Sequence, residues 1–82
     1  MVKVIFDDKF QKQLSKIKDR SFKDQINKQI EKIIHNPHTG KPMRYERKGT
    51  RELYMKPFRL AYNYHENNDT IEILDLYHKD EQ

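Results

Sequence analysis

Residues 40–79 read GKPMRYERKGTRELYMKPFRLAYNYHENNDTIEILDLYHK, and this half of the chain decides the fold. After a turn that contains glycine and proline, polar and apolar side chains alternate along residues 51–56, 58–64 and 70–77, which is the period of a β-strand. Short turn-forming segments separate these three runs. This half of the chain therefore predicts a small, mostly antiparallel sheet.

Alternation along these strands assigns the side chains to two faces of the sheet. Leu53 and Met55 share one face of the first strand. Leu60 and Tyr62 belong to the face of the second strand that should meet the helices. Residues 70–77 are the most apolar, which predicts a strand at the centre of the sheet. The opposite, concave face would collect Glu52, Tyr54, Lys56, Arg59 and the end of the last strand at His78 and Lys79.

The first half of the chain changes its period after one short strand. Val2–Phe6 is β-branched and aromatic, and Asp7 or Asp8 can cap the helix that follows. Ser21 is the expected N-cap of a second helix, and Asp24 three residues later resembles a capping box with the shorter acid. The apolar stripes of the two helices consist of Phe10, Leu14 and Ile17 and of Ile26, Ile30, Ile33 and Ile34. A run of turn formers then ends the second helix.

The predicted order of elements is β-α-α-β-β-β. This is an α+β fold in which an N-terminal strand and a two-helix hairpin pack on the sheet. Residues 43–46 leave room for one further short strand. With 82 residues, the chain is expected to form a single domain over residues 1–82, with a thin core.

Composition excludes several classes of function. Cysteine is absent, which rules out disulfides, thiolate chemistry and zinc sites built on cysteine. The four histidines show no metal-ligand spacing, so we expect no metal and no cofactor. No apolar stretch approaches the roughly 20 residues that span a bilayer, and residues 1–8 lack the apolar core of a signal peptide. We therefore expect a cytoplasmic protein with no membrane partner.

The charge of the chain points to an anionic partner. A formal net charge of +4 and a pI near 9.3 suit either nucleic acid or an acidic polypeptide. Between Lys41 and Arg51, five cations accompany one acid, and the ring of Tyr45 could stack on a base. The alternative for this run is a solvated loop. The candidate RNA-binding residues are Lys41, Arg44, Tyr45, Arg47, Lys48, Arg51, Tyr54 and Lys56.

A small set of side chains could carry phosphodiester chemistry. Arg59 can donate two hydrogen bonds to a phosphate, and its alternative role is a salt bridge to Glu52 or Asp75. An imidazole such as that of His78 can accept and donate a proton near neutral pH, although an ordinary surface histidine is the alternative. Glu52 and Glu46 are candidate bases or orienting carboxylates.

The Gly40-Lys41-Pro42 turn, the hairpin and the strand Phe58-Arg59-Leu60-Ala61-Tyr62 together resemble the RelE/ParE superfamily of toxin–antitoxin toxins. The resemblance spans nearly the whole chain, because two amphipathic helices precede this part in the family order. It implies that Arg59 is a catalytic, phosphate-contacting residue. The ending Tyr77-His78-Lys79 is similar to the Arg-Tyr-His-Tyr ending of the YoeB branch. That similarity implies an active-site role for the histidine, while Lys79 would stabilise charge or protonate a leaving oxygen.

The resemblance implies a toxin of a type II toxin–antitoxin pair. Its activity would be ribosome-dependent, metal-independent endonucleolytic cleavage of mRNA, in which a ribose 2′-hydroxyl attacks the adjacent phosphorus and translation stops. Glu52 or His78 would accept the proton of the 2′-hydroxyl, and His78 or Lys79 would protonate the leaving 5′ oxygen. Met43 stands where the YoeB branch has a glutamate. Lys56 or Arg51 would assist the strand arginine in stabilising the phosphoryl charge.

The same resemblance implies the partners and the alternatives. The partners would be a RelB-like antitoxin, the ribosomal A site and mRNA, with a monomeric toxin inside a toxin–antitoxin hetero-oligomer. One alternative is a ParE-like protein that binds and inhibits DNA gyrase without cleaving RNA. Another is an inactive RNA-binding or structural module.

Overall fold

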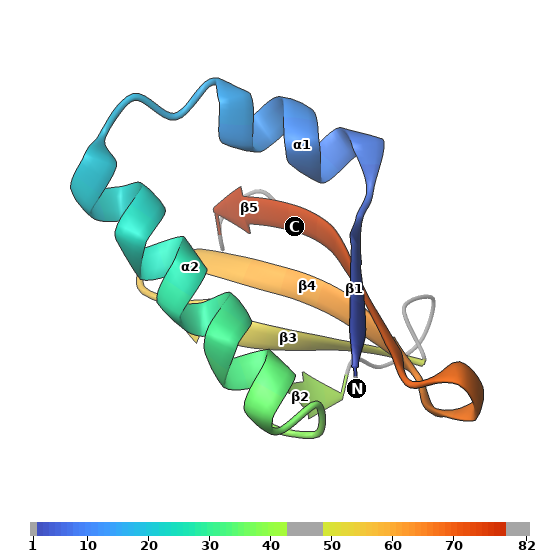
Figure 1. The fold of residues 1–82 in the computed structure, drawn as a ribbon. Coiled ribbons are helices and arrows are strands. Elements are labelled where there is room, and N and C mark those ends of the chain that lie inside the picture. Colours follow the sequence, from blue (N-terminus) through green and yellow to red (C-terminus); the bar gives the residue numbers. More distant parts are fainter. Residues whose placement is uncertain (1, 43–48, 79–82) are drawn as a thin grey trace.

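A computed structural model describes residues 2–42 and 49–78 of the chain. In chain order its elements are β1 (Lys3–Phe6), α1 (Asp8–Ser15), α2 (Arg20–His35), β2 (Lys41–Pro42), β3 (Thr50–Met55), β4 (Phe58–His65), the 3₁₀ turn η2 (Glu66–Asn68) and β5 (Thr70–His78). α2 lies across one face of the sheet and α1 runs beside β5 (Figure 1). We call the face turned away from α2 the open face. The predicted α+β fold is confirmed.

The five strands are arranged in the order β1-β5-β4-β3-β2. β1 pairs with β5 in parallel, and every other pair is antiparallel. The sequence predicts residues 70–77 at the centre of the sheet. β5 is an interior strand, as its apolar composition requires, but the middle position belongs to β4. The further strand predicted at 43–46 lies outside the described residues, and the short edge strand β2 ends at Pro42.

The N-cap of each helix is an aspartate. Asp7 caps α1, as predicted, and its carboxylate accepts a hydrogen bond of 3.0 Å from the backbone N–H of Lys9. The prediction that Ser21 caps α2 is wrong. Asp19 is the cap, because its carboxylate accepts from the N–H groups of Ser21 (2.9 Å) and Phe22 (3.4 Å) and so starts the helix earlier.

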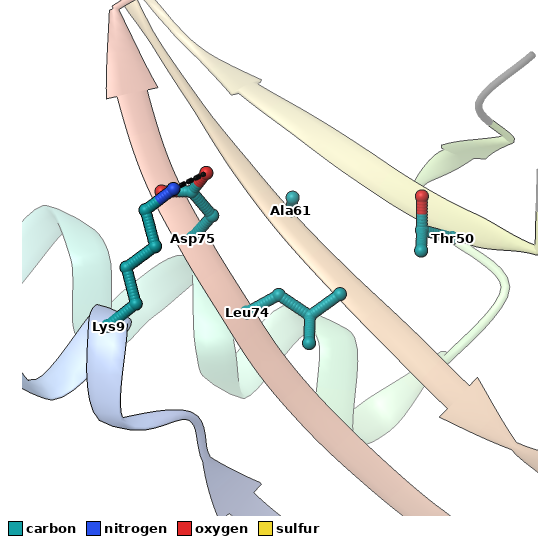
Figure 2. A pocket seen from close by; sticks show the side chains of 5 residues that line it. All are labelled: Lys9, Thr50, Ala61, Leu74 and Asp75. Carbon is teal, nitrogen blue, oxygen red and sulfur yellow. Dashed lines mark hydrogen bonds and ion pairs between the residues drawn. The ribbon is translucent and has the colours of Figure 1, made fainter. Parts of the chain in front are cut away.

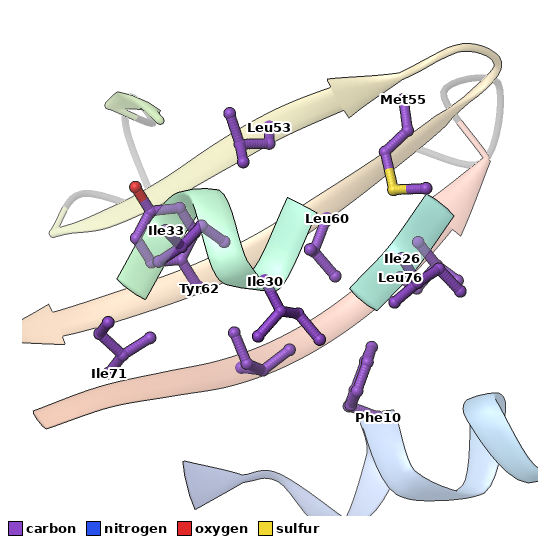
Figure 3. Packing of buried hydrophobic residues seen from close by; sticks show 11 residues of the cluster. Phe10, Ile26, Ile30, Ile33, Leu53, Met55, Leu60, Tyr62, Ile71 and Leu76 are labelled. Atoms are coloured by element: carbon purple, nitrogen blue, oxygen red, sulfur yellow. The ribbon is translucent and has the colours of Figure 1, made fainter. Parts of the chain in front are cut away.

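The core lies between the sheet and the two helices (Figure 3). It brings the predicted apolar stripes of the helices onto the predicted inner face of β3 and β4, and hydrophobic burial of this kind is the main stabilising term of a small domain. The buried residues that form it are Phe10, Ile26, Ile30, Ile33, Leu53, Met55, Leu60, Tyr62, Ile71, Ile73 and Leu76. Leu14, Ile17 and Ile34 pack at its rim, partly buried.

A β-bulge interrupts the alternation of β5. Ala61 of β4 is opposite Asp75, whereas the next residue of β4, Tyr62, is opposite Ile73, so Leu74 is an extra residue. Ile73 faces the core, and the next core residue of the strand is Leu76, three positions later. The bulge therefore turns both Leu74 and Asp75 toward the open face, where they line a common hollow with Ala61.

Beyond the end of β1, the element that lies beside β5 is α1. β1 ends at Phe6, and the N–H of Asp7 still donates to the carbonyl of Ile73 (2.9 Å). Further along β5, Gln13 of α1 accepts from the N–H of Leu76 through Oε1 (2.9 Å) and donates from Nε2 to Asp75 Oδ1 (2.8 Å). A side-chain amide thus satisfies a strand N–H that would otherwise lack a partner at this sheet edge.

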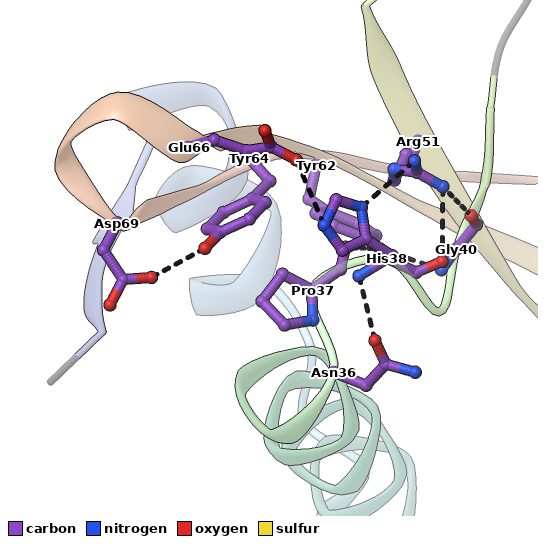
Figure 4. A network of polar contacts seen from close by, with 9 residues as sticks. All are labelled: Asn36, Pro37, His38, Gly40, Arg51, Tyr62, Tyr64, Glu66 and Asp69. Carbon is purple, nitrogen blue, oxygen red and sulfur yellow. Dashed lines mark hydrogen bonds and ion pairs between the residues drawn. The ribbon is translucent and has the colours of Figure 1, made fainter.

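The turn after α2 is fastened to the sheet by Tyr62 and Arg51 (Figure 4). The Tyr62 hydroxyl accepts from the N–H of Gly40 (2.8 Å) and donates to the carbonyl of Pro37 (2.7 Å). Arg51 Nη1 donates to the carbonyls of Gly40 (2.8 Å) and His38 (3.2 Å). A Cβ at Gly40 would lie 2.7 Å from the Tyr62 hydroxyl, so only glycine allows this close approach.

The first prediction concerns the Tyr62 hydroxyl. Tyr62→Phe should lower the free energy of unfolding by about 1–3 kcal/mol, because it leaves the N–H of Gly40 and the carbonyl of Pro37 without their buried partner. Chemical denaturation of the two proteins measures this loss. Tyr54→Phe is the matched control, since Tyr54 is 53% exposed, and it should change little. Equal midpoints for Tyr62→Phe and the wild type would contradict the assigned role.

The second prediction concerns alkaline pH. Burial raises the pKa of the Tyr62 hydroxyl above its ordinary value of 10.0. The unfolded state therefore loses this proton first, so the stability is fully present below about pH 10 and is lost as the pH rises through the folded-state pKa. Denaturation midpoints measured from pH 8 to 11 should fall less steeply for Tyr62→Phe than for the wild type. Parallel declines would refute this assignment.

Candidate active site on the open face of the sheet

Four polar and aromatic side chains meet on the open face where β3, β4 and β5 lie side by side. Tyr54, Arg59 and Tyr77 are in register across the three strands. Glu52 precedes Tyr54 by two residues on β3 and therefore points to the same face. We call these four residues the Glu52 cluster. The structure thus brings together Glu52, Tyr54 and Arg59 as predicted, and adds Tyr77.

Glu52 holds the cluster together. Its Oε1 accepts from Arg59 Nη1 at 3.0 Å, and its Oε2 accepts from the Tyr77 hydroxyl at 2.7 Å. The side chain of Glu52 is 13% exposed, so a carboxylate largely removed from water has a donor on each oxygen. Charge-assisted hydrogen bonds of this kind are short and directional. Glu52 consequently fixes the positions of both a guanidinium and a phenol.

Arg59 forms the salt bridge to Glu52 that the sequence leaves as its alternative role. Asp75, the other alternative, accepts hydrogen bonds from Lys9 and Gln13 instead. The guanidinium also lies 5.8 Å from the ring centroid of Tyr54, within range of a cation–π contact. Its side chain keeps 31% exposure, and a guanidinium has five N–H donors. Arg59 is thus oriented by its neighbours and still accessible to an anion.

The predicted placement of His78 on the concave face is wrong. His78 is opposite Phe58, and the two rings make an edge contact with centroids 5.4 Å apart. Phe58 in turn packs on Phe22 of α2 at 4.9 Å, so this imidazole lies on the helix side of the sheet. Strict alternation from Ile73 would give the opposite result, but the bulge shifts the strand by one residue and exchanges the faces of Tyr77 and His78.

The predicted RNA-binding cations divide into three groups. Arg51 faces the helix side, where its guanidinium holds the turn at Gly40, so its predicted place on an RNA-binding surface is not supported. Lys41 and Lys56 are exposed. Lys41 is in register with Glu52. The RNA-binding candidates that lie outside the described residues are Arg44, Tyr45, Arg47 and Lys48. The candidate carboxylate Glu46 and the candidate catalytic residue Lys79 lie outside them too.

Sequence reasoning missed the part that Tyr77 plays in the site. This tyrosine is only 7% exposed, and its hydroxyl reaches a carboxylate from a strand 25 residues earlier in the chain. The local pattern alone gives no signal for the contact, because a strand with strict alternation would bury Tyr77 in the core. The contact between Tyr77 and Glu52 becomes evident only from the strand pairing, because β4 lies between β3 and β5 and sets the face to which Tyr77 points.

Two classes of site find no support within the part of the chain that the structure describes. Among residues 2–42 and 49–78, no group of three or more His, Asp or Glu side chains is arranged to hold a metal ion. Within the same residues, neither helix has the length and apolar character needed to cross a membrane.

The chain is similar to known toxins over nearly its full length. The family model for the "ParE toxin of type II toxin-antitoxin system, parDE" matches residues 4–82. No curated protein matches the sequence significantly.

Solved structures share the fold. The toxin–antitoxin complex RelBE2 from Mycobacterium tuberculosis contains a chain with a TM-score of 0.80 and 25% identity, covering 95% of this chain and 98% of that one. The intact RelBE toxin–antitoxin complex from E. coli gives a TM-score of 0.80 at 12% identity, covering 95% and 96%. The conserved protein HP0894 from Helicobacter pylori gives 0.66 at 23% identity, covering 98% and 97%. The chain therefore belongs to the ParE toxin family of type II toxin–antitoxin systems, within the RelE/ParE toxin superfamily.

Proposed function

We propose that this toxin is a ribosome-dependent, metal-independent endonuclease that cleaves mRNA and so inhibits translation. The observation that carries the proposal is the ion pair of Glu52 and Arg59 on the open face, with the exposed ring of Tyr54 beside it. An oriented guanidinium suits a phosphate, a carboxylate suits proton transfer, and an exposed ring suits base stacking. RNA is the substrate class that uses all three.

In the proposed reaction, these side chains carry out the proton transfers. A ribose 2′-hydroxyl attacks the adjacent phosphorus while Glu52 accepts its proton, and the bond to the 5′ oxygen breaks. The products are a 2′,3′-cyclic phosphate and a 5′-hydroxyl. Tyr77 protonates the leaving oxygen and recovers its proton from Glu52 through the 2.7 Å hydrogen bond between them. Arg59 stabilises the charge that develops on the phosphoryl oxygens, and Lys79, from the end of the chain, would add to that charge stabilisation.

The pairing of charges also accounts for a need for the ribosome. Glu52 neutralises the charge of Arg59, so this pair attracts free RNA only weakly. The ribosomal A site would supply the alignment of mRNA that the toxin surface lacks, and correct alignment alone can provide a large part of a rate enhancement. This proposal places the protein in the cytoplasm, where translation takes place.

A cognate antitoxin completes the proposal. The similar toxin chains come from complexes named toxin–antitoxin complexes, including one of E. coli RelE with a peptide of the antitoxin RelB. We expect a RelB-like partner with an acidic, amphipathic segment, because this chain carries a net charge of +4. The toxin would be a monomer within that hetero-oligomer.

The third prediction tests Arg59. Arg59→Ala should reduce cleavage of A-site codons by about 100-fold or more, because it removes the cation that stabilises the transition state. His78→Gln should have a much smaller effect, since its ring lies with Phe58 on the helix side. Primer extension on translating ribosomes incubated with each purified protein gives the rates.

The matched control for this test is Lys3→Ala, which removes an exposed cation from β1 and should cut mRNA as the wild type does. Free RNA should remain intact under the same conditions. Unchanged cleavage by Arg59→Ala, or a loss in His78→Gln as large as in Arg59→Ala, would contradict the assignment of roles. Rapid cutting of free RNA would contradict the dependence on the ribosome.

A second candidate function is inhibition of DNA gyrase by binding without RNA chemistry. The match to the ParE family favours it, and the salt bridge between Arg59 and Glu52 is equally compatible with a toxin that only binds, because such a toxin needs no arginine to contact a phosphate. The fourth prediction separates the two. At concentrations that cut A-site mRNA, the protein should leave supercoiling by purified gyrase unchanged. Inhibited supercoiling together with intact mRNA would establish the second candidate instead.

A further inference from the structure

A hollow of about 240 Å³ lies on the open face of the sheet (Figure 2). Its lining consists of Lys9, Thr50, Ala61, Leu74 and Asp75. The middle of the lining is the methyl group of Ala61, which is in register with the longer side chains of Glu52 on one side and Asp75 on the other. The hollow exists because Ala61, the smallest of these three cross-strand neighbours, lies on the middle strand of the three.

One wall of the hollow combines a hydrogen-bond donor with an acceptor. Lys9 Nζ lies 3.2 Å from Asp75 Oδ2, and Asp75 Oδ1 accepts from Gln13 at 2.8 Å. The carboxylate is fixed in position, with 14% of its side chain exposed, whereas the lysine is 65% exposed. An ammonium has three protons and each carboxylate oxygen has two lone pairs, so this pair can still donate and accept at its outer edge.

The remaining lining is suited to a flat apolar ring. Ala61 and Leu74 form its apolar part, and Thr50 lies across from the ion pair in Figure 2. The volume corresponds to roughly eight water molecules at about 30 Å³ each, which a single planar ring system could displace. A flat apolar contact beside a paired donor and acceptor is the chemistry that recognises a nucleobase.

The hollow lies beside the proposed site of cleavage, because its lining residue Ala61 is in register with Glu52. Ala61 follows Arg59 by two residues on β4, so the two positions are about 7 Å apart on the same face. We propose that the hollow binds one nucleobase of the RNA strand whose phosphate lies at Arg59. This inference rests on the proposed function, because it assigns the base contacted by that same substrate strand.

The ion pair also favours particular bases. Adenine, cytosine and guanine each carry an exocyclic amino group that can donate to Asp75 while a neighbouring acceptor faces Lys9. Uracil has no amino group, and its one ring N–H lies between two carbonyl oxygens that the carboxylate would repel. The hollow should therefore bind the three amino-bearing bases in preference to uracil.

The test uses the toxin alone, without ribosomes, so that it does not depend on catalysis. Adenosine, cytidine, guanosine and uridine 5′-monophosphates are titrated into isotope-labelled protein, and the NMR shifts of the Ala61, Thr50 and Leu74 methyl groups are followed. Ala61→Leu fills the hollow, whereas Lys3→Ala changes an exposed residue of β1 outside the hollow and serves as the control. Lys9→Met is a second variant, which removes the ammonium donor at the rim and with it the ion pair to Asp75. Ribose 5-phosphate controls for binding of the phosphate alone.

We expect saturable shifts of these methyl groups with the three amino-bearing nucleotides, and at least threefold weaker binding of uridine monophosphate. Lys3→Ala should retain the shifts, Ala61→Leu should lose those of the Thr50 and Leu74 methyl groups, and Lys9→Met should weaken binding several-fold. Arg59→Ala should weaken binding but keep the preference among bases. If Ala61→Leu does not fold, the loss in Lys9→Met decides the question.

Three results would overturn the inference. The first is the absence of shifts at millimolar nucleotide, and the second is equal shifts with ribose 5-phosphate. The third is a response of the Ala61 methyl to an acidic, leucine-containing peptide but to no nucleotide, which would make the hollow a site for a protein side chain. Failure of the proposed function has a different signature: wild-type toxin that leaves A-site mRNA intact, whatever the titrations give.

Discussion

One extra residue in β5 determines which side chains reach the open face. Because Leu74 has no partner of its own on β4, the strand shifts by one position between Ile73 and Leu76. The shift keeps Leu76 in the core and turns Tyr77 toward Glu52, while the ring of His78 packs with Phe58. A bulge is a local defect in hydrogen bonding, and here it sets both the polar cluster and the hollow beside it.

Charge on the open face is organised in pairs. Glu52 is bound to Arg59, and Asp75 is bound to Lys9. Both carboxylates are mostly removed from water, and each has a hydrogen-bond donor on both of its oxygens. Burial of a carboxylate is costly unless it is paired in this way. The arrangement fixes two cations at defined positions, each with its charge balanced by a carboxylate, which favours recognition by shape and position at these two pairs.

The turn between α2 and the sheet uses residues that composition alone assigns to binding. Arg51 belongs to the most basic run of the chain, yet its guanidinium donates to the carbonyls of His38 and Gly40. Tyr62 completes the same turn from the core side, and its ring permits only glycine at position 40. Satisfying backbone groups at the end of a helix is a structural requirement that a cation can meet as well as any neutral donor.

The sequence by itself determined the periodic features of this protein: the strand period of residues 51–56 and 58–64, the apolar stripes of both helices and the family resemblance of the Phe58-Arg59-Leu60-Ala61-Tyr62 strand. These features depend on residues two to four positions apart in the chain, so the order of the residues is enough to recognise them. The tertiary structure alone decided that Glu52 binds Arg59 and Tyr77, that His78 lies on the helix side, and that Ala61 leaves a hollow. These outcomes depend on strand register, which the bulge changes and which long-range pairing sets.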